Sequence, residues 1–173
     1  MTADTILYAC NTVAVGLFGI VLSAAFCNIR WTRRNVCCMV ASTLAIFLIQ
    51  GIVYLGIDPA LGPYLYPLHT HLPLAITLCL LSHERLWPVI SVLTAYLCCQ
   101  LPRWVDLVVT ALTRSELIGE ICYTLVIGPL FYLLYRFFVR PAYAAMMASP
   151  QSLLLFGSLS VAYYFFDYAT VVY

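Results

Sequence analysis

Ionisable and amide side chains interrupt stretches of sequence that are otherwise apolar, and these are the residues of the chain that could do chemistry. A carboxylate in an apolar environment needs a cation, hydroxyl donors or a proton of its own. Asp167 has three tyrosines and a threonine within one helical turn, which could supply the hydroxyl donors. The candidate ligand-binding residues are Asp167, Glu120, Gln100, His69, His71, Gln50 and Asn11.

Structural roles compete with binding roles at several of these positions. Hydrogen bonds from Asn or Gln between membrane helices contribute about 0.6–2 kcal/mol, and packing is their commonest use, so Asn11 and Gln50 fit that role. For Asp167 and Glu120, a functional and a structural role stand equally open.

Metal, cofactor and catalytic sites are not indicated. His69 and His71 are two apart, so on a helix they point roughly 200° apart and could share a metal only if the helix were unwound. None of the eight cysteines has CxxC spacing, and we interpret them as packing residues. The chain contains no HExxH motif, nucleophile elbow or glycine-rich phosphate loop, so we expect no enzyme activity from it and no cofactor.

The elements that must position these residues are membrane helices. Hydrophobic residues make up 64% of the 173 residues and charged ones 9%, too few to cover a soluble core. About 20 apolar residues cross a hydrocarbon core of roughly 30 Å. We predict an all-α, polytopic transmembrane bundle, a single domain spanning residues 1–173 in the lipid bilayer. Its six predicted spans are Thr5–Phe26, Val36–Ile57, Tyr66–Ser82, Leu86–Leu101, Leu117–Phe138 and Gln151–Tyr173.

The segment after the fourth span has two interpretations. Either the span ends near Pro102 and Trp104–Leu112 forms an interfacial helix, or one long helix continues through Arg103 and Asp106. Proline and the charges that follow it favour the break.

The arginines predict the orientation, because basic residues of short loops stay on the cytoplasmic side. Alternating the span ends places six arginines at one side and two at the other, so the N-terminus is predicted outside. The seven candidate residues then all lie in the outer half, roughly 5–10 Å below the interface. We expect them to line a polar cavity open to the outside. The six arginines predicted on the cytoplasmic side are Arg30, Arg33, Arg34, Arg85, Arg136 and Arg140, and the two predicted outside are Arg103 and Arg114.

Tryptophans near the predicted span ends fit interfacial anchors. Trp87 and Trp104 lie at such ends, and Trp31 stands beside three arginines, as an inner-leaflet anchor does. The formal net charge is only +1 and no run of charge exists, so nucleic acid is not an expected partner.

Three segments resemble the N-terminal membrane regions of GHKL-type sensor histidine kinases from Gram-positive gut bacteria. They are SVLTAYLCCQLPRW at Ser91–Trp104, LLFGSLSVAYYFFDYATVVY at Leu154–Tyr173 and HTHLPLAITLCLL at His69–Leu81. In that family a membrane domain precedes a coiled-coil dimerisation segment and an ATP-binding kinase domain. The resemblance implies a multi-pass protein of the bacterial plasma membrane, in a two-component system, that dimerises through a C-terminal part.

The chain departs from this pattern because no linker helix or ATP-binding box lies before Tyr173. We therefore expect either a fragment or a truncated or split relative. The leading hypothesis is an input domain that senses an extracellular or membrane-borne small molecule or peptide. One alternative is a small transporter or transporter subunit with Asp167 or Glu120 as coupling carboxylate, and another is a scaffold subunit.

Overall fold

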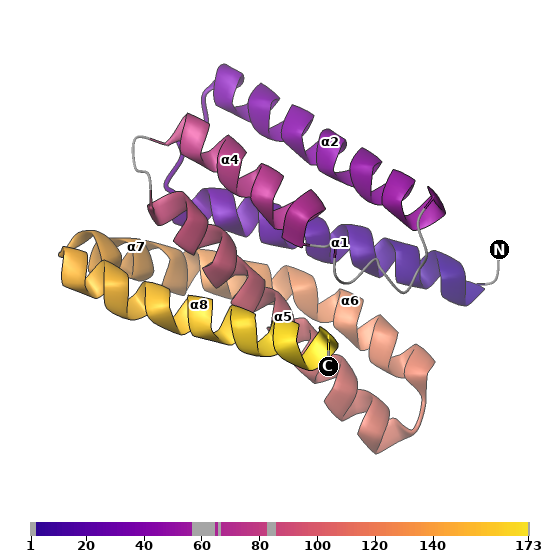
Figure 1. Ribbon diagram of the computed structural model, residues 1–173. Helices are drawn as coiled ribbons and strands as arrows, with labels where there is room; N and C mark the ends of the chain where they lie inside the picture. The colour runs from indigo at the N-terminus through magenta and orange to yellow at the C-terminus, as the bar shows by residue number, and fades with distance from the viewer. Residues whose placement is uncertain (1–2, 57–64, 66, 83–85, 173) are drawn as a thin grey trace.

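The computed structural model describes residues 3–56, 65, 67–82 and 86–172, and every element in this part of the chain is a helix (Figure 1). The all-α prediction is therefore confirmed. In chain order the elements are α1 (Ala3–Phe26), α2 (Arg33–Gly56), the π-helical turn η1 (Pro67–His71), α4 (Leu72–Leu81), α5 (Trp87–Thr113), α6 (Glu116–Leu133), the π-helical segment η2 (Leu134–Val139), α7 (Arg140–Met147) and α8 (Pro150–Val172).

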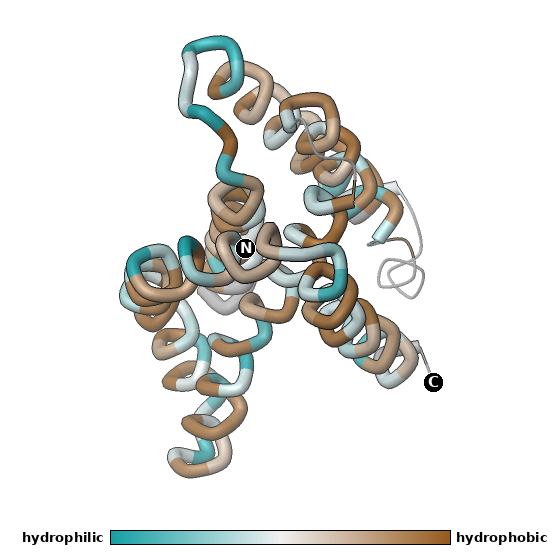
Figure 2. The backbone as a smooth tube through the Cα atoms, turned by 90° about the vertical axis from the view of Figure 1, so that its left-hand side faces the viewer, coloured by the Kyte–Doolittle hydropathy of each residue, from teal (hydrophilic) through white to brown (hydrophobic). Residues whose placement is uncertain are grey.

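Four helical segments are long and apolar enough to cross a membrane. Figure 2 shows hydrophobic stretches along the helices and hydrophilic residues at several connections. The chain is therefore a membrane protein, as its composition predicts, whereas the count of six spans stays a prediction. The four segments are Ala9–Phe26, Arg33–Val53, Trp87–Thr113 and Glu116–Met147, and Pro67–Leu81 is apolar but shorter.

Helix α5 is the centre of the bundle, because it packs against α1, α4, α6 and α8. One apolar core joins α1, α5 and α7 around Phe26 and Trp87, both almost fully buried. A second core joins α1, α2 and α4, with Ile46 and Leu78 at its centre. Helix α2 packs mainly on α4 and η1 and thus forms an outer layer of the bundle (Figure 1).

The predicted break at Pro102 is wrong, because α5 runs unbroken from Trp87 to Thr113. Proline removes one backbone N–H from the helix, but membrane helices tolerate this where neighbouring helices support the backbone. Pro102 is fully buried, in keeping with such support. The residues predicted to form an interfacial helix, Trp104–Leu112, instead extend α5 to 27 residues, or about 40 Å.

The fifth predicted span also continues further than expected. Helix α6 passes through η2 into α7, so helical structure extends to Met147 and a short turn leads to α8. Pro141 lies in the first turn of α7, directly after the π-helical segment. A wider π-helical turn can relieve the clash between the proline ring and the carbonyl of the preceding turn.

Trp87 is not an interfacial anchor. Its side chain is 1% exposed, and its indole Nε1–H donates to the backbone carbonyl of Phe26 at 2.9 Å. Cys27 and Ser91 meet beside it, with 3.2 Å between Sγ and Oγ. Hydrogen bonds thus connect the C-terminal end of α1 to the first turns of α5.

Successive long helices alternate in direction, as the orientation argument requires. The α1–α2 connection and α7 lie toward one end of the molecule, and the turn between α5 and α6 lies at the opposite end (Figure 1). The first end carries Arg30, Arg33, Arg34, Arg136 and Arg140, while Arg85 and the segment 57–64 are outside the described residues.

Candidate functional site

The structure brings four of the seven candidate residues into two separate polar clusters. One, the Asp167 cluster, consists of His71, Tyr96, Tyr164 and Asp167 and joins η1, α5 and α8. The other, the Glu120 cluster, consists of Asn11, Glu120 and Thr124 and joins α1 and α6.

Three rings pack edge to face in the Asp167 cluster. The ring centroids of His71 and Tyr96 are 5.0 Å apart, those of His71 and Tyr164 5.4 Å, and those of Tyr96 and Tyr164 5.1 Å. The angles between the ring planes are 77°, 74° and 68°. Such mutual edge-to-face contacts contribute about 0.5–1.5 kcal/mol per pair beyond burial. The three helical segments therefore meet through one cluster of three aromatic rings.

Hydrogen bonds link the same residues. The Tyr96 hydroxyl donates to Oδ2 of Asp167, which gives that carboxylate a donor within the bundle. His71 Nδ1 lies 3.0 Å from the Tyr164 hydroxyl, and the tautomer of the imidazole determines which of the two donates. The imidazole can therefore either donate to the Tyr164 hydroxyl or accept from it.

A stripe on α8 positions this cluster. Gly157, Ser160, Tyr164 and Asp167 recur every three or four residues and so share one face of the helix. A Cβ at Gly157 would stand 2.8 Å from the Ile90 side chain, so glycine allows α8 to approach α5 closely. Ser160 hydrogen-bonds to Thr94 of α5 with 3.0 Å between their oxygens. The side chains of Tyr164 and Asp167 are then directed at Tyr96.

In the Glu120 cluster, an amide of α1 meets a carboxylate of α6. Asn11 Nδ2 lies 3.4 Å from both Oε2 and the backbone carbonyl oxygen of Glu120. The Thr124 hydroxyl can donate to Asn11 Oδ1 or to the Glu120 carbonyl oxygen, which is 3.1 Å away. Asn11 is buried, so this network closes a helix contact. The predicted packing role of Asn11 agrees with this geometry.

The other three candidates lie outside both clusters. His69 is buried within η1. Gln50 and Gln100 are half-buried, and neither forms a side-chain hydrogen bond with another described residue.

The seven candidate residues do not line either of the two clearest hollows among the described residues. The two clearest hollows in the described part of the chain are lined by other residues: an apolar groove between α1 and α2, and a shallow polar hollow beside Tyr135, Arg136 and Arg140. Within each cluster the polar side chains instead contact one another, because hydroxyl and amide groups in an apolar bundle gain most by pairing directly. Among the described residues, no group of three His, Cys, Asp or Glu could hold a metal ion.

The sequence reasoning missed Tyr96 and Thr124. Tyr96 lies nine residues into α5, about 14 Å along the helix from Trp87. A tyrosine so far from a helix end is not an interfacial anchor, and its hydroxyl needs a partner. That position in the sequence was the signal that could have identified it.

Comparisons of this chain with protein-family models, with curated proteins and with solved structures found no match.

Proposed function

We propose that the chain is a membrane-embedded input domain that converts binding of an extracellular or membrane-borne ligand into a shift of helices. The observation that supports this best is the Asp167 cluster. The Asp167 carboxylate of α8 accepts a hydrogen bond from the Tyr96 hydroxyl of α5, and the adjoining rings extend the contact to η1. Ionisable residues inside membrane segments are costly to bury and commonly serve function.

The proposal includes the protein that receives the signal from this input domain. From the resemblance of Ser91–Trp104 and Leu154–Tyr173 to sensor regions, we propose a GHKL-type histidine kinase as output and the bacterial plasma membrane as location. A ligand that paired with Asp167 or with His71 would replace a hydrogen bond between helices. Helices α5 and α8 would then have two arrangements, one with this hydrogen bond and one with the ligand bound in its place. The ligand shifts the equilibrium between them by as much as its affinities for the two arrangements differ.

The test compares Asp167→Asn with Glu116→Gln, an exposed carboxylate at the start of α6 that serves as matched control. Histidine phosphorylation of a kinase encoded in the same or the adjacent reading frame is measured in native membranes at equal levels of this protein. We expect Asp167→Asn to change the phosphorylation level and Glu116→Gln to leave it unchanged. Equal phosphorylation in all three proteins would contradict the proposal.

The transporter alternative is favoured by the presence of two carboxylates within the bundle, Asp167 and Glu120, on different helices. It predicts proton-coupled flux in proteoliposomes that carry a pH-sensitive dye in their lumen. The input-domain proposal predicts no flux above that of empty liposomes. Flux that Asp167→Asn abolishes would favour the transporter.

A further inference from the structure

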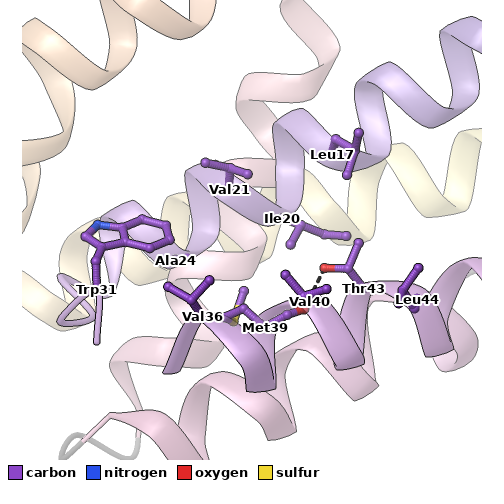
Figure 3. A pocket seen from close by; sticks show the side chains of 10 residues that line it. All are labelled: Leu17, Ile20, Val21, Ala24, Trp31, Val36, Met39, Val40, Thr43 and Leu44. Carbon is purple, nitrogen blue, oxygen red and sulfur yellow. Dashed lines mark hydrogen bonds between the residues drawn. The ribbon is translucent and has the colours of Figure 1, made fainter. Parts of the chain in front are cut away.

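An apolar groove lies between α1 and α2 on the outside of the bundle (Figure 3). Its volume is about 340 Å³, within the range of small-molecule sites. It exists because α2 packs on α4 and η1, so that its other side faces α1 across a gap. Leu17 and Val21 line it from α1, Val36 and Val40 line it from α2, and Trp31 stands at one end.

The lining of the groove suits a hydrocarbon chain. Its one hydroxyl, that of Thr43, already donates to the backbone carbonyl of Met39 at 2.8 Å (Figure 3). The other lining groups are aliphatic or thioether, with the Trp31 indole at the end. An extended peptide would leave its backbone N–H and C=O groups unpaired there, at a cost of several kcal/mol per group. An acyl chain has no such groups.

Positive charge lies at the Trp31 end of the groove. Arg30, Arg33 and Arg34 flank Trp31 in the sequence, and all three are exposed. The turn that carries them is held in place, because Asn35 Nδ2 donates to the Arg30 carbonyl at 2.9 Å. No carboxylate of the described residues forms an ion pair with these arginines. Their guanidinium groups are therefore available for a phosphate, which arginine binds with two parallel hydrogen bonds.

We propose that this groove binds an anionic phospholipid. One acyl chain lies between α1 and α2, and the headgroup phosphate is bound by the arginines beside Trp31. The indole then lies at headgroup level, where tryptophan is enriched in membrane proteins, and basic pockets beside membrane helices bind anionic headgroups. The proposal does not depend on the proposed function, since it uses neither polar cluster.

Fluorescence of Trp31 tests this. Trp104→Phe removes the other exposed indole, and Trp87 remains as a buried internal reference. The protein is reconstituted into phosphatidylcholine vesicles that contain a fixed fraction of lipid brominated near the headgroup end of its acyl chains. The brominated lipid is either phosphatidylglycerol or phosphatidylcholine. We expect phosphatidylglycerol to quench Trp31 more strongly. Both leaflets have the same composition, so the result does not depend on orientation.

Variants separate headgroup binding from groove binding. Neutralising each arginine singly, as in Arg33→Gln, should lower the apparent affinity for brominated phosphatidylglycerol about fivefold. Arg136→Gln, in a basic hollow elsewhere, should leave it unchanged. Val40→Phe fills the groove and should reduce quenching by both lipids, whereas Leu48→Phe, on an exposed part of α2 outside the groove, should not.

Two results would overturn the proposal. Equal quenching of Trp31 by the two lipids would show that no anionic headgroup is selected. A lack of quenching by either, together with disulfide cross-linking of Val40→Cys between two copies in a cysteine-free background, would show that a second copy of the chain occupies the groove.

Discussion

At the scale of single residues, the polar groups of this bundle act in pairs across helices. The Asp167 carboxylate would be costly in an apolar bundle, and the Tyr96 hydroxyl reduces that cost by donating to it. The same rule applies to Asn11 and Glu120. Asp167 and Glu120 therefore each have a hydrogen-bond donor on another helix. Removing that donor should lower the free energy of unfolding by a measurable amount.

Tyr96→Phe removes the hydroxyl that donates to Asp167 and keeps the ring in place. We expect the free energy of unfolding to fall by about 1 kcal/mol, the usual contribution of a hydrogen bond between membrane helices. Tyr132→Phe is the control, because Tyr132 is 64% exposed. Unfolding of both variants is followed by circular dichroism in mixed micelles.

A double-mutant cycle extends this prediction. Asp167→Asn should cost less in the Tyr96→Phe background than in the wild type, since the two residues share one hydrogen bond. Asp167→Asn and Glu120→Gln should add independently, because their clusters share no residue. Non-additive effects of the two substitutions would contradict this and would support the shared cavity that the sequence predicts.

At the scale of elements, the close approach of α5 and α6 depends on a glycine. A Cβ at Gly119 would collide with Thr110 Oγ1 and Asp106 Oδ1 and would stand 3.2 Å from the Asp106 backbone oxygen. The absence of a side chain at this position lets the turn between the two helices close. In contrast, a Cβ at Gly128 would meet nothing within 4 Å.

Gly119→Ala should therefore destabilise the protein by about 1–3 kcal/mol, as overpacking does. Gly128→Ala should leave stability unchanged or raise it by up to about 1 kcal/mol, because alanine favours a helix over glycine. The midpoints of thermal unfolding in detergent distinguish the two. Similar losses in both variants would mean that the α5–α6 contact is looser than described.

The continuity of α5 can be measured as a distance. Spin labels at Val89→Cys and Leu112→Cys, both exposed positions of α5, are separated by 23 residues. A continuous helix puts about 35 Å between the two Cα positions, whereas a break at Pro102 with a surface helix would shorten this to roughly 25 Å. Pulsed electron resonance in a variant without native cysteines measures this separation. The shorter distance would show that α5 is broken at Pro102 and that Trp104–Leu112 forms a separate interfacial helix.

At the scale of the whole molecule, arginine distribution predicts which end of the bundle faces the cytoplasm. The α1–α2 connection and the region of α7 hold most of the arginines that the structure describes, and they lie at the same end (Figure 1). The turn between α5 and α6 lies at the other end. The Glu120 cluster lies near this turn, because Glu120 is four residues from the start of α6.

Cysteine labelling tests this orientation in a cysteine-free background. Thr113→Cys, at the end of α5, should react with a membrane-impermeant maleimide in intact cells. Thr32→Cys and Ala148→Cys should react only after permeabilisation, because both lie at the arginine-rich end. All three positions are exposed, so burial does not confound the comparison. The reverse pattern would place the turn between α5 and α6, with the Glu120 cluster near it, on the cytoplasmic side.

The sequence by itself determined the helical class and the membrane environment, because these follow from local composition. A lipid-embedded backbone must satisfy its hydrogen bonds within each segment, so an apolar stretch of sufficient length predicts a helix without knowledge of its neighbours. The same argument located the candidate residues, and Asp167, His71, Glu120 and Asn11 all take part in contacts between helices.

Only the tertiary structure decided the partners of those residues. In a helix that is apolar all round, no stripe of hydrophobic residues indicates which face meets which neighbour. The pairing of Tyr96 with Asp167 therefore depends on how α8 packs against α5. The continuity of α5 at Pro102 likewise depends on packing, since Pro102 is buried among neighbouring helices. The local sequence does not show which helices these are.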